Sequence, residues 1–236
     1  MAYAERMLDT AGGPQAASLP DALVFGLKDG MSATAQSHAP HSVVFYEGDD
    51  ATRFYEVDEG IVMLFKLLPD GRRQVVEILN PGTIFGVAAG DLYDCSAETL
   101  TRTSLRAFDR REVERSLPLQ RHLTRCLLTQ METLHDHAVL LGRKSAIERV
   151  SSFLMRLVPQ RGGIGCAGPD KESASDSLDV ILTMTRQEIA DYLGLTIETV
   201  SRVISDLKRR GLVTVERQDR IRINRICGIC QLSGIH

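Results

Sequence analysis

Two short helical patterns on either side of Gly194 constrain the fold of this chain more than any other stretch. Thr185 can accept a hydrogen bond from a free amide of the first turn, and Glu188 three residues later completes a capping box. A helix is therefore predicted to begin directly after Thr185. Gly194 provides the backbone freedom of a sharp turn. A second helix then follows Thr196 as its N-cap and is predicted to end near Arg210.

The second predicted helix separates an apolar face from a polar one. Helical spacing places the apolar residues on the buried side, namely Val200, Val203, Ile204 and Leu207. The N-cap and the outer face hold the candidate DNA-binding residues, namely Thr196, Glu198, Thr199, Ser201, Arg202 and Ser205. This is the helix-turn-helix pattern, whose second helix enters the major groove of DNA. A structural three-helix element with a solvated polar face remains the alternative.

The candidate side chains have the chemistry that base reading needs. Arg202 can donate two hydrogen bonds to guanine O6 and N7, and Glu198 can accept one from the cytosine N4 amine. Ser201 or Thr199 can contact thymine or a phosphate. The sequence therefore predicts double-stranded DNA as a partner.

Residues 182–202, LTMTRQEIADYLGLTIETVSR, resemble the signature of the CRP/FNR superfamily of bacterial transcription regulators, in particular its FNR and FixK branches. In that group the pattern E-x-x-S-R on the recognition helix reads a TTGAT half-site and its inverted repeat. The resemblance therefore implies base contacts from Glu198, Ser201 and Arg202. It covers about residues 40–225, and the FixK branch implies control of genes for low-oxygen or nitrogen-related metabolism.

The distribution of charge supports a DNA-binding C-terminal part. The formal net charge of the chain is −3. Residues 186–225 contain nine Lys or Arg against six Asp or Glu, which leaves 19 against 25 for the rest of the chain. The sequence shows neither an apolar run long enough to span a membrane nor a secretory leader, so we expect no membrane partner and a cytoplasmic location.

The N-terminal half is predicted to contain a small β-roll. Residues 1–40 are rich in Ala, Gly, Ser and Pro and are expected to form a flexible arm, with a short helix near residues 21–27. Residues 41–116 contain short apolar runs separated by Gly and Pro-Gly turns, which is typical of an antiparallel roll. The phrases YEGD at 46–49 and NPGTIFG at 80–86 resemble the cyclic-nucleotide-binding-like effector domain of the same superfamily.

The residues that would bind an effector in relatives are replaced here. Cyclic-nucleotide-binding relatives carry a glutamate after the Phe-Gly pair and an arginine in an R-S-A triplet, where this chain has Val87 and Cys95. Burying a phosphate without a neutralising cation is costly, so no response to cyclic AMP is expected. An iron-sulfur cluster of the FNR type is also not expected, because no cysteine precedes Cys95. We therefore expect no cofactor, although His38 and His41 leave a haem or metal site as an alternative.

Residues 117–142 are predicted to form one long helix that pairs with its twin. Leu119, Leu123, Leu127, Met131 and Leu134 recur every three or four residues, and the stripe continues close to a heptad repeat. Part of the stripe can pack on the roll of its own chain. The resemblance implies that the rest forms a homodimer interface, which would match a palindromic operator.

Residues 143–225 are predicted to form a winged helix-turn-helix domain, with Gly142 as a hinge before it. A helix is expected at 145–157, a surface loop at 159–177, a strand at 178–182, and a hairpin wing after Gly211. Arg217, Arg220 and Arg222 of this wing can approach phosphates, although solvated charges at a strand edge are an equal alternative. Residues 226–236 are interpreted as a tail.

The five cysteines, an odd number without framework spacing, are interpreted as reduced thiols. A zinc site at Cys227 and Cys230 would need two further ligands, and His236 is the only candidate nearby. Reversible oxidation remains an open alternative for each thiol, namely Cys95, Cys126, Cys166, Cys227 and Cys230.

The complete prediction is an α+β chain with an N-terminal double-stranded β-roll, a long dimerisation helix and a C-terminal winged helix-turn-helix. It describes a homodimeric transcription activator that contacts RNA polymerase, with the exposed turn at residues 69–73 as the candidate patch. One alternative is the same fold as a ligand- or haem-dependent sensor. The other is a metalloenzyme of the cupin type, which would need histidines that residues 42–110 do not contain.

Overall fold

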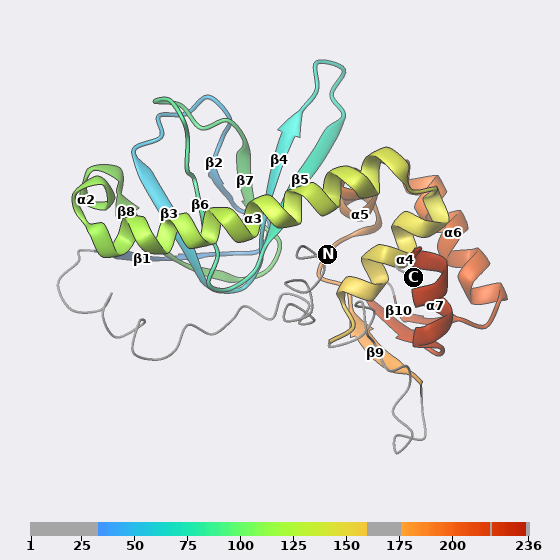
Figure 1. The fold of residues 1–236 in the computed structure, drawn as a ribbon. Coiled ribbons are helices and arrows are strands. Elements are labelled where there is room, and N and C mark those ends of the chain that lie inside the picture. Colours follow the sequence, from blue (N-terminus) through green and yellow to red (C-terminus); the bar gives the residue numbers. More distant parts are fainter. Residues whose placement is uncertain (1–32, 160–175, 218, 235–236) are drawn as a thin grey trace, which may run out of the picture. The chain divides into compact units, whose positions relative to one another are not determined.

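The structure is a computed structural model that describes residues 33–159, 176–217 and 219–234. The chain divides into two compact units, with the boundary after His137. The N-terminal unit is a β-roll with most of one long helix, and the C-terminal unit combines helices with a small sheet (Figure 1). The α+β fold class predicted from the sequence is therefore confirmed.

The roll is built from two four-stranded antiparallel sheets. The first has the strand order β1 (Thr34–His38), β8 (Thr103–Asp109), β3 (Arg53–Glu59) and β6 (Ile84–Phe85). The second has the order β2 (Val43–Phe45), β7 (Ser96–Thr99), β4 (Val62–Leu67) and β5 (Arg73–Leu79). Alternating side chains of both sheets point into one core, which holds the roll together.

Aromatic rings fill the centre of this core. Phe45 stacks on Tyr93 with ring centroids 3.7 Å apart, and Tyr55 and Phe85 lie beside them. The buried Tyr93 hydroxyl donates a hydrogen bond of 2.8 Å to the Arg53 carbonyl, so the only polar atom of that ring has a partner. The roll therefore has a well-packed aromatic core.

The long helix α3 (Leu117–Arg143) follows the short helix α2 (Arg110–Arg115). Leu119 is buried among Phe54, Ile84 and Phe108, and this fixes the first half of α3 on the roll. Another part of the helix surface stays exposed in the single chain, including Leu127, Leu128, Met131 and Leu134.

The C-terminal unit contains the predicted helix-turn-helix and wing. Its helices are α4 (Ala146–Arg156), α5 (Arg186–Leu193), α6 (Ile197–Arg209) and α7 (Ile226–Ser233). A three-stranded antiparallel sheet has the order β10 (Val213–Arg217), β11 (Arg220–Ile223) and β9 (Leu178–Ile181). Arg149 of α4 donates to the carbonyls of Leu141 and Leu193 at 2.7 and 2.8 Å, which anchors the start of this unit to the end of α5.

Two segments that the sequence analysis left without regular structure contain elements. The predicted arm reaches residue 40, but β1 at Thr34–His38 already pairs with β8. The predicted tail contains α7, which packs against α4 although its first turn includes Gly228. A side chain at that glycine would lie 2.6 Å from Leu212, so close packing explains a residue that disfavours helices in isolation.

Strand β3 was also missed, since its sequence RFYEVDE carries charges within an apolar run. The charge of Glu56 is compensated inside the fold by Arg106 of the neighbouring strand β8, at 2.8 Å. The predicted short helix at 21–27, most of the arm, and almost all of the loop at 159–177 with Cys166 lie outside the described residues.

Candidate nucleic-acid interface

Helix α5 begins as the sequence predicted. The Thr185 hydroxyl accepts from the Glu188 amide at 3.2 Å, and the Glu188 carboxylate accepts from the Thr185 amide at 2.6 Å. This capping box fixes the first turn of the helix. At the other end, Gly194 has a φ of 59°, the left-handed conformation that lets the chain turn sharply into α6.

Helix α6 is amphipathic, as predicted. Val200, Ile204 and Leu207 are buried, and Val203 is half-buried. The Thr196 hydroxyl accepts from the Thr199 amide at 3.3 Å and lies 3.1 Å from the Thr199 hydroxyl. These two candidate residues therefore form the start of the helix. The side chain of Thr199 is half-buried rather than fully exposed.

The remaining candidate residues of α6 are all exposed, namely Glu198, Ser201, Arg202 and Ser205. Glu198 and Arg202 are four residues apart, which places them one turn apart on the same side of the helix. The pKa of the Glu198 carboxyl is lowered by hydrogen bonds from its own amide and from Thr196, with a smaller contribution from the charge of Arg202. The exposed pair therefore presents an ionised acceptor next to a guanidinium donor.

A hollow beside α6 contains a residue that the sequence analysis missed. It has a volume of about 290 Å³ and is lined by Arg186, Ser201, Ile204, Ser205, Lys208 and Val215. The Nη1 atom of Arg186 is buried and has no hydrogen-bond partner within the described part of the chain. Burial lowers the pKa of this guanidinium. The hollow is suited to an anion, because Arg186, Lys208 and two serine hydroxyls line it.

No local pattern in the sequence pointed to Arg186, because its surroundings come from three separate elements. It is the first residue of α5, and the hollow adds α6 and Val215 of β10. A basic residue at the start of a helix, where the amides are positive, is the one local hint of an anion site.

The wing is formed by β10 and β11, paired in an antiparallel manner. Arg217 and Arg220 face each other across this pair and are exposed. Arg222 lies 3.8 Å from Asp179 of β9 and donates to Ser177. Part of the hydrogen-bonding capacity of Arg222 is therefore taken up by residues of its own unit. Arg217 and Arg220 have the exposure that a phosphate contact requires.

The roll contains a separate cavity of about 360 Å³. Its walls include the aromatic rings of Phe45, Phe85 and Tyr93 and the side chain of Val87. Lys66 is the one Lys or Arg among its lining residues, and it forms an ion pair of 2.9 Å with Glu47.

The other polar side chains of this cavity are two carboxylates, a thiol and an amide. They are Glu77, Asp94, Cys95 and Gln130. Burial raises the pKa of the Cys95 thiol to about 11, so this cysteine stays protonated at neutral pH. The lining thus offers a phosphate little positive charge.

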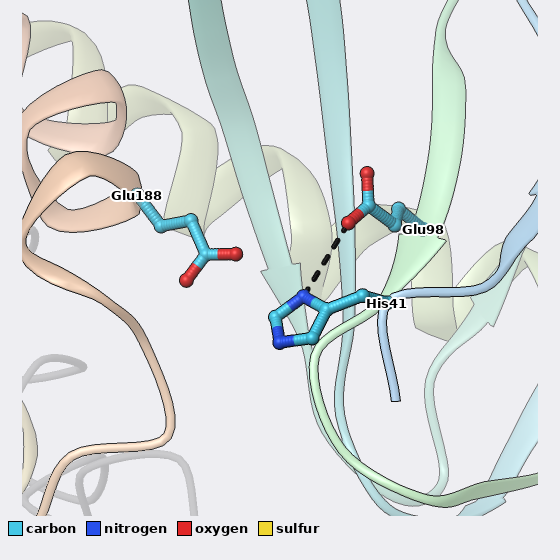
Figure 2. Close-up of side chains that lie close together, drawn as sticks. All are labelled: His41, Glu98 and Glu188. Carbon is cyan, nitrogen blue, oxygen red and sulfur yellow. Dashed lines mark ion pairs between the residues drawn. The ribbon is translucent and has the colours of Figure 1, made fainter. Parts of the chain in front are cut away.

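The histidines considered as metal ligands have protein partners. His41 Nδ1 lies 3.5 Å from Glu98 Oε1 (Figure 2), and His38 pairs with Gln36 at 3.3 Å. Glu188, also drawn in Figure 2, belongs to the C-terminal unit, where it closes the capping box of α5.

Comparisons with known proteins match both units. The family of cyclic nucleotide-binding domains matches residues 35–117, and the family of Crp-like helix-turn-helix domains matches residues 148–232. The chain is 40% identical over 180 residues to the nitrogen fixation regulation protein FixK of Rhizobium meliloti, covering 76% of this chain and 77% of the relative. It is 29% identical over 203 residues to the transcriptional activator protein FnrL of Cereibacter sphaeroides, covering 84% and 80%.

The structure of FixK2 from Bradyrhizobium japonicum has the same fold. It superposes with a TM-score of 0.72 at 32% identity, covering 86% of this chain and 98% of that structure. A roll of the cyclic-nucleotide-binding type joined to a Crp-like helix-turn-helix defines a DNA-binding transcription regulator. The chain belongs to the CRP/FNR family of these regulators and is of the FixK type.

This membership confirms the family resemblance seen in the sequence, and it excludes the cupin-type enzyme as an alternative. Within the described ranges, no helix combines the length and the apolar character that crossing a membrane requires.

Proposed function

We propose that this regulator activates transcription as a homodimer at a palindromic site of the TTGAT type. The observation that carries the proposal is the exposure of Glu198, Ser201 and Arg202 on one helix whose start is fixed by the Thr196 cap. A rigid helix holds the guanidinium and the carboxylate in place before DNA arrives, which reduces the entropy lost on binding. Arg202 would contact the guanine of each half-site, and Glu198 a cytosine amine of the opposite strand.

Phosphate contacts would position the helix in the groove. Arg186, which lines the hollow together with Ser201 and Ser205, is a candidate donor to a phosphate oxygen. Arg217 and Arg220 of the wing are further candidates. Such contacts provide affinity and register, whereas the base contacts provide sequence preference.

Homodimer formation is supported by the exposed side of α3. Leu127 (39% exposed), Met131 (48%) and Leu134 (40%) follow one another at spacings of four and three, so they form one apolar stripe. Leu127 and Leu134 also line the cavity of the roll, but all three side chains stay partly in solvent in the single chain. A second copy of the same helix would cover this stripe along a twofold axis, which a palindromic operator requires.

The biological setting is proposed from the relatives. The FixK proteins that this chain resembles are named for nitrogen fixation regulation. We propose control of genes for low-oxygen or nitrogen-related metabolism, without cyclic AMP as an effector, because Lys66 is already paired with Glu47 at the cavity of the roll. The same cavity supports a second candidate function, namely a regulator that responds to a small ligand with little negative charge.

The base-reading proposal is tested by competition gel shifts with Arg202→Ala on a TTGAT palindrome and on one with the guanines replaced. We expect the wild-type preference for guanine, about 1 to 3 kcal/mol, to be lost in the variant. Arg209→Ala is the matched control, because Arg209 is exposed on the same helix and ion-paired with Asp206. This control should keep the preference. Full discrimination by Arg202→Ala would show that another residue reads the guanine.

A further inference from the structure

The junction between α3 and α4 is organised around the side chain of Arg149. This residue lies near the start of α4 and is half-buried. Its Nη2 atom donates to the Leu141 carbonyl at 2.7 Å, and its Nε atom donates to the Lys144 carbonyl at 2.9 Å. Leu141 is in the last turn of α3 and Lys144 follows that helix directly, so the guanidinium holds the end of α3.

The same guanidinium also holds the turn of the helix-turn-helix. Its Nη1 atom donates to the Leu193 carbonyl at 2.8 Å and lies 3.4 Å from the carbonyl oxygen of Gly194. Leu193 is the last residue of α5, and Thr196, the N-cap of α6, follows shortly after it. One side chain therefore joins the end of α3 to the point where α6 begins.

Two helix ends supply the negative charge that faces this cation. The last carbonyls of a helix have no partner within the helix and carry partial negative charge. Leu141 and Leu193 provide such carbonyls at the ends of α3 and α5. A guanidinium has several N–H donors in one fixed plane, so it can bind both helix ends at once, whereas the ammonium of a lysine is a single compact charge.

Few other contacts determine how the end of α3 is placed within the C-terminal unit. Helix α4 packs on α6 and α7, whereas the last turns of α3 make few close backbone approaches to the described helices of this unit. Gly142, also in the last turn of α3, has open space where a side chain would lie. A glycine inside a helix weakens it, and packing does not require one here. The hydrogen bonds of Arg149 are therefore a principal restraint on this junction.

We propose that Arg149 is a positioning residue that makes the dimer selective for one spacing between half-sites, an inference that rests on the palindromic site proposed above. Arg149 holds α6 at one angle to the last turn of α3. In a twofold dimer, any change of that angle occurs in both protomers, so its effect on the separation of the two α6 helices is doubled. Each added base pair moves a half-site by about 3.4 Å along the DNA. A fixed junction therefore excludes the wrong spacings.

The test compares a palindrome of TTGAT half-sites one helical turn apart with palindromes that carry additional central base pairs. Full-length wild type and Arg149→Gln are titrated with each DNA and with a single half-site, and fluorescence anisotropy measures binding. The variant should lose roughly tenfold of the wild-type preference for the first palindrome, because hydrogen bonds from a charged group are removed. Affinity for the single half-site and the preference for guanine should not change, since no residue on the exposed face of α6 is altered.

Lys144→Gln is the matched control. Lys144 is a cation of the same junction, but its Nζ atom donates to the Ser152 hydroxyl and to the Ser233 carbonyl at the end of α7, both at 2.8 Å. Its replacement removes hydrogen bonds without releasing the turn before α6, so the spacing preference should be kept. A general loss of stability lowers the affinity for every DNA by the same factor, and the ratio between two spacings does not change.

Arg149→Lys keeps the charge but not the planar fork, so it should also lose spacing preference, and it decides the matter if Arg149→Gln does not fold. An unchanged spacing preference in folded Arg149→Gln would overturn the proposal. If neither variant binds the single half-site, Arg149 is required for the fold itself and the proposal is equally wrong. A wild type without any spacing preference would contradict the proposed palindromic site and this inference together.

Discussion

Replacing either of two arginines in the helix-turn-helix should change DNA binding, but in different ways. Arg202 is exposed on α6, whereas Arg186 at the start of α5 has a buried Nη1 atom without a partner among the described residues. A group that contacts a base contributes preference between sequences. A group that contacts a phosphate contributes affinity to every sequence alike.

Arg186→Gln should therefore weaken DNA binding about equally on the TTGAT palindrome and on unrelated DNA. The removal of one phosphate contact should also reduce the slope of log K against log salt by about 0.9. Fluorescence anisotropy titrations between low and physiological salt measure both effects. Arg209→Ala again serves as the control for an exposed arginine. A loss restricted to the palindrome would assign Arg186 to base reading instead.

His122 should make the stability of the roll depend on pH. Hydrogen bonds with Cys126 and with the Glu56 carboxylate raise the pKa of this imidazole to about 9 from an ordinary value of 6.5, so folding favours the protonated ring. The resulting contribution, roughly 1 to 3 kcal/mol, is fully present below pH 6.5 and is lost as the pH rises through 9. Urea unfolding of the wild type and His122→Gln should show a difference in free energy that shrinks over this interval. His135→Gln should show no comparable trend.

At the scale of elements, the exposed stripe of α3 should carry dimer formation. A charge at Leu134 would place two carboxylates in the same apolar seam, where neither has a partner, and this is costly in a buried interface. Leu134→Glu should therefore shift the protein to monomer in light scattering and weaken binding to the palindrome more than to a single half-site. Thr129→Glu, which adds the same charge at another exposed position of α3, should stay dimeric. A dimeric Leu134→Glu protein would rule out this seam.

Local signals explain which elements could be predicted from the sequence. The capping box of Thr185 and Glu188, the positive φ of Gly194, and the apolar repeat of α3 are all determined within a few residues, and each prediction was confirmed. Strand β3 and helix α7 were missed because their stability comes from distant partners. Glu56 needs Arg106 of another strand, and Gly228 needs the close approach of Leu212.

The same distinction applies to the sites. The outward position of Glu198 and Arg202 follows from helical periodicity alone, so the exposed polar face of α6 was predictable. The hollow around Arg186 combines three elements, and the contact of His122 with Glu56 joins α3 to a strand of the roll. Pairings of this kind depend on the tertiary structure, which spacing in a single sequence does not contain.

At the scale of the whole molecule, DNA binding and activation should be separable, because the proposed polymerase contact lies in the roll unit. The turn at residues 69–73 joins β4 and β5 and is held by local bonds. The Leu68 amide donates to the Arg72 carbonyl at 2.8 Å, and Arg72 Nε lies 2.7 Å from the Asp70 carboxylate. The exposed side chains of Leu67 and Leu68 lie beside this charged turn. This turn is ordered and presents both apolar and charged side chains, which suits a weak contact with another protein.

Arg72→Ala should leave operator binding unchanged in gel shifts and reduce activated transcription in a reconstituted assay with RNA polymerase. The expected reduction is several-fold, because truncating a single charged side chain in a protein contact typically costs on the order of 1 kcal/mol. Arg111→Ala, which removes an exposed arginine from α2 of the same unit, is the matched control and should activate normally. Unimpaired activation by Arg72→Ala would exclude Arg72 from the polymerase contact. A parallel loss of DNA binding would instead mean that the substitution perturbs the fold of the regulator.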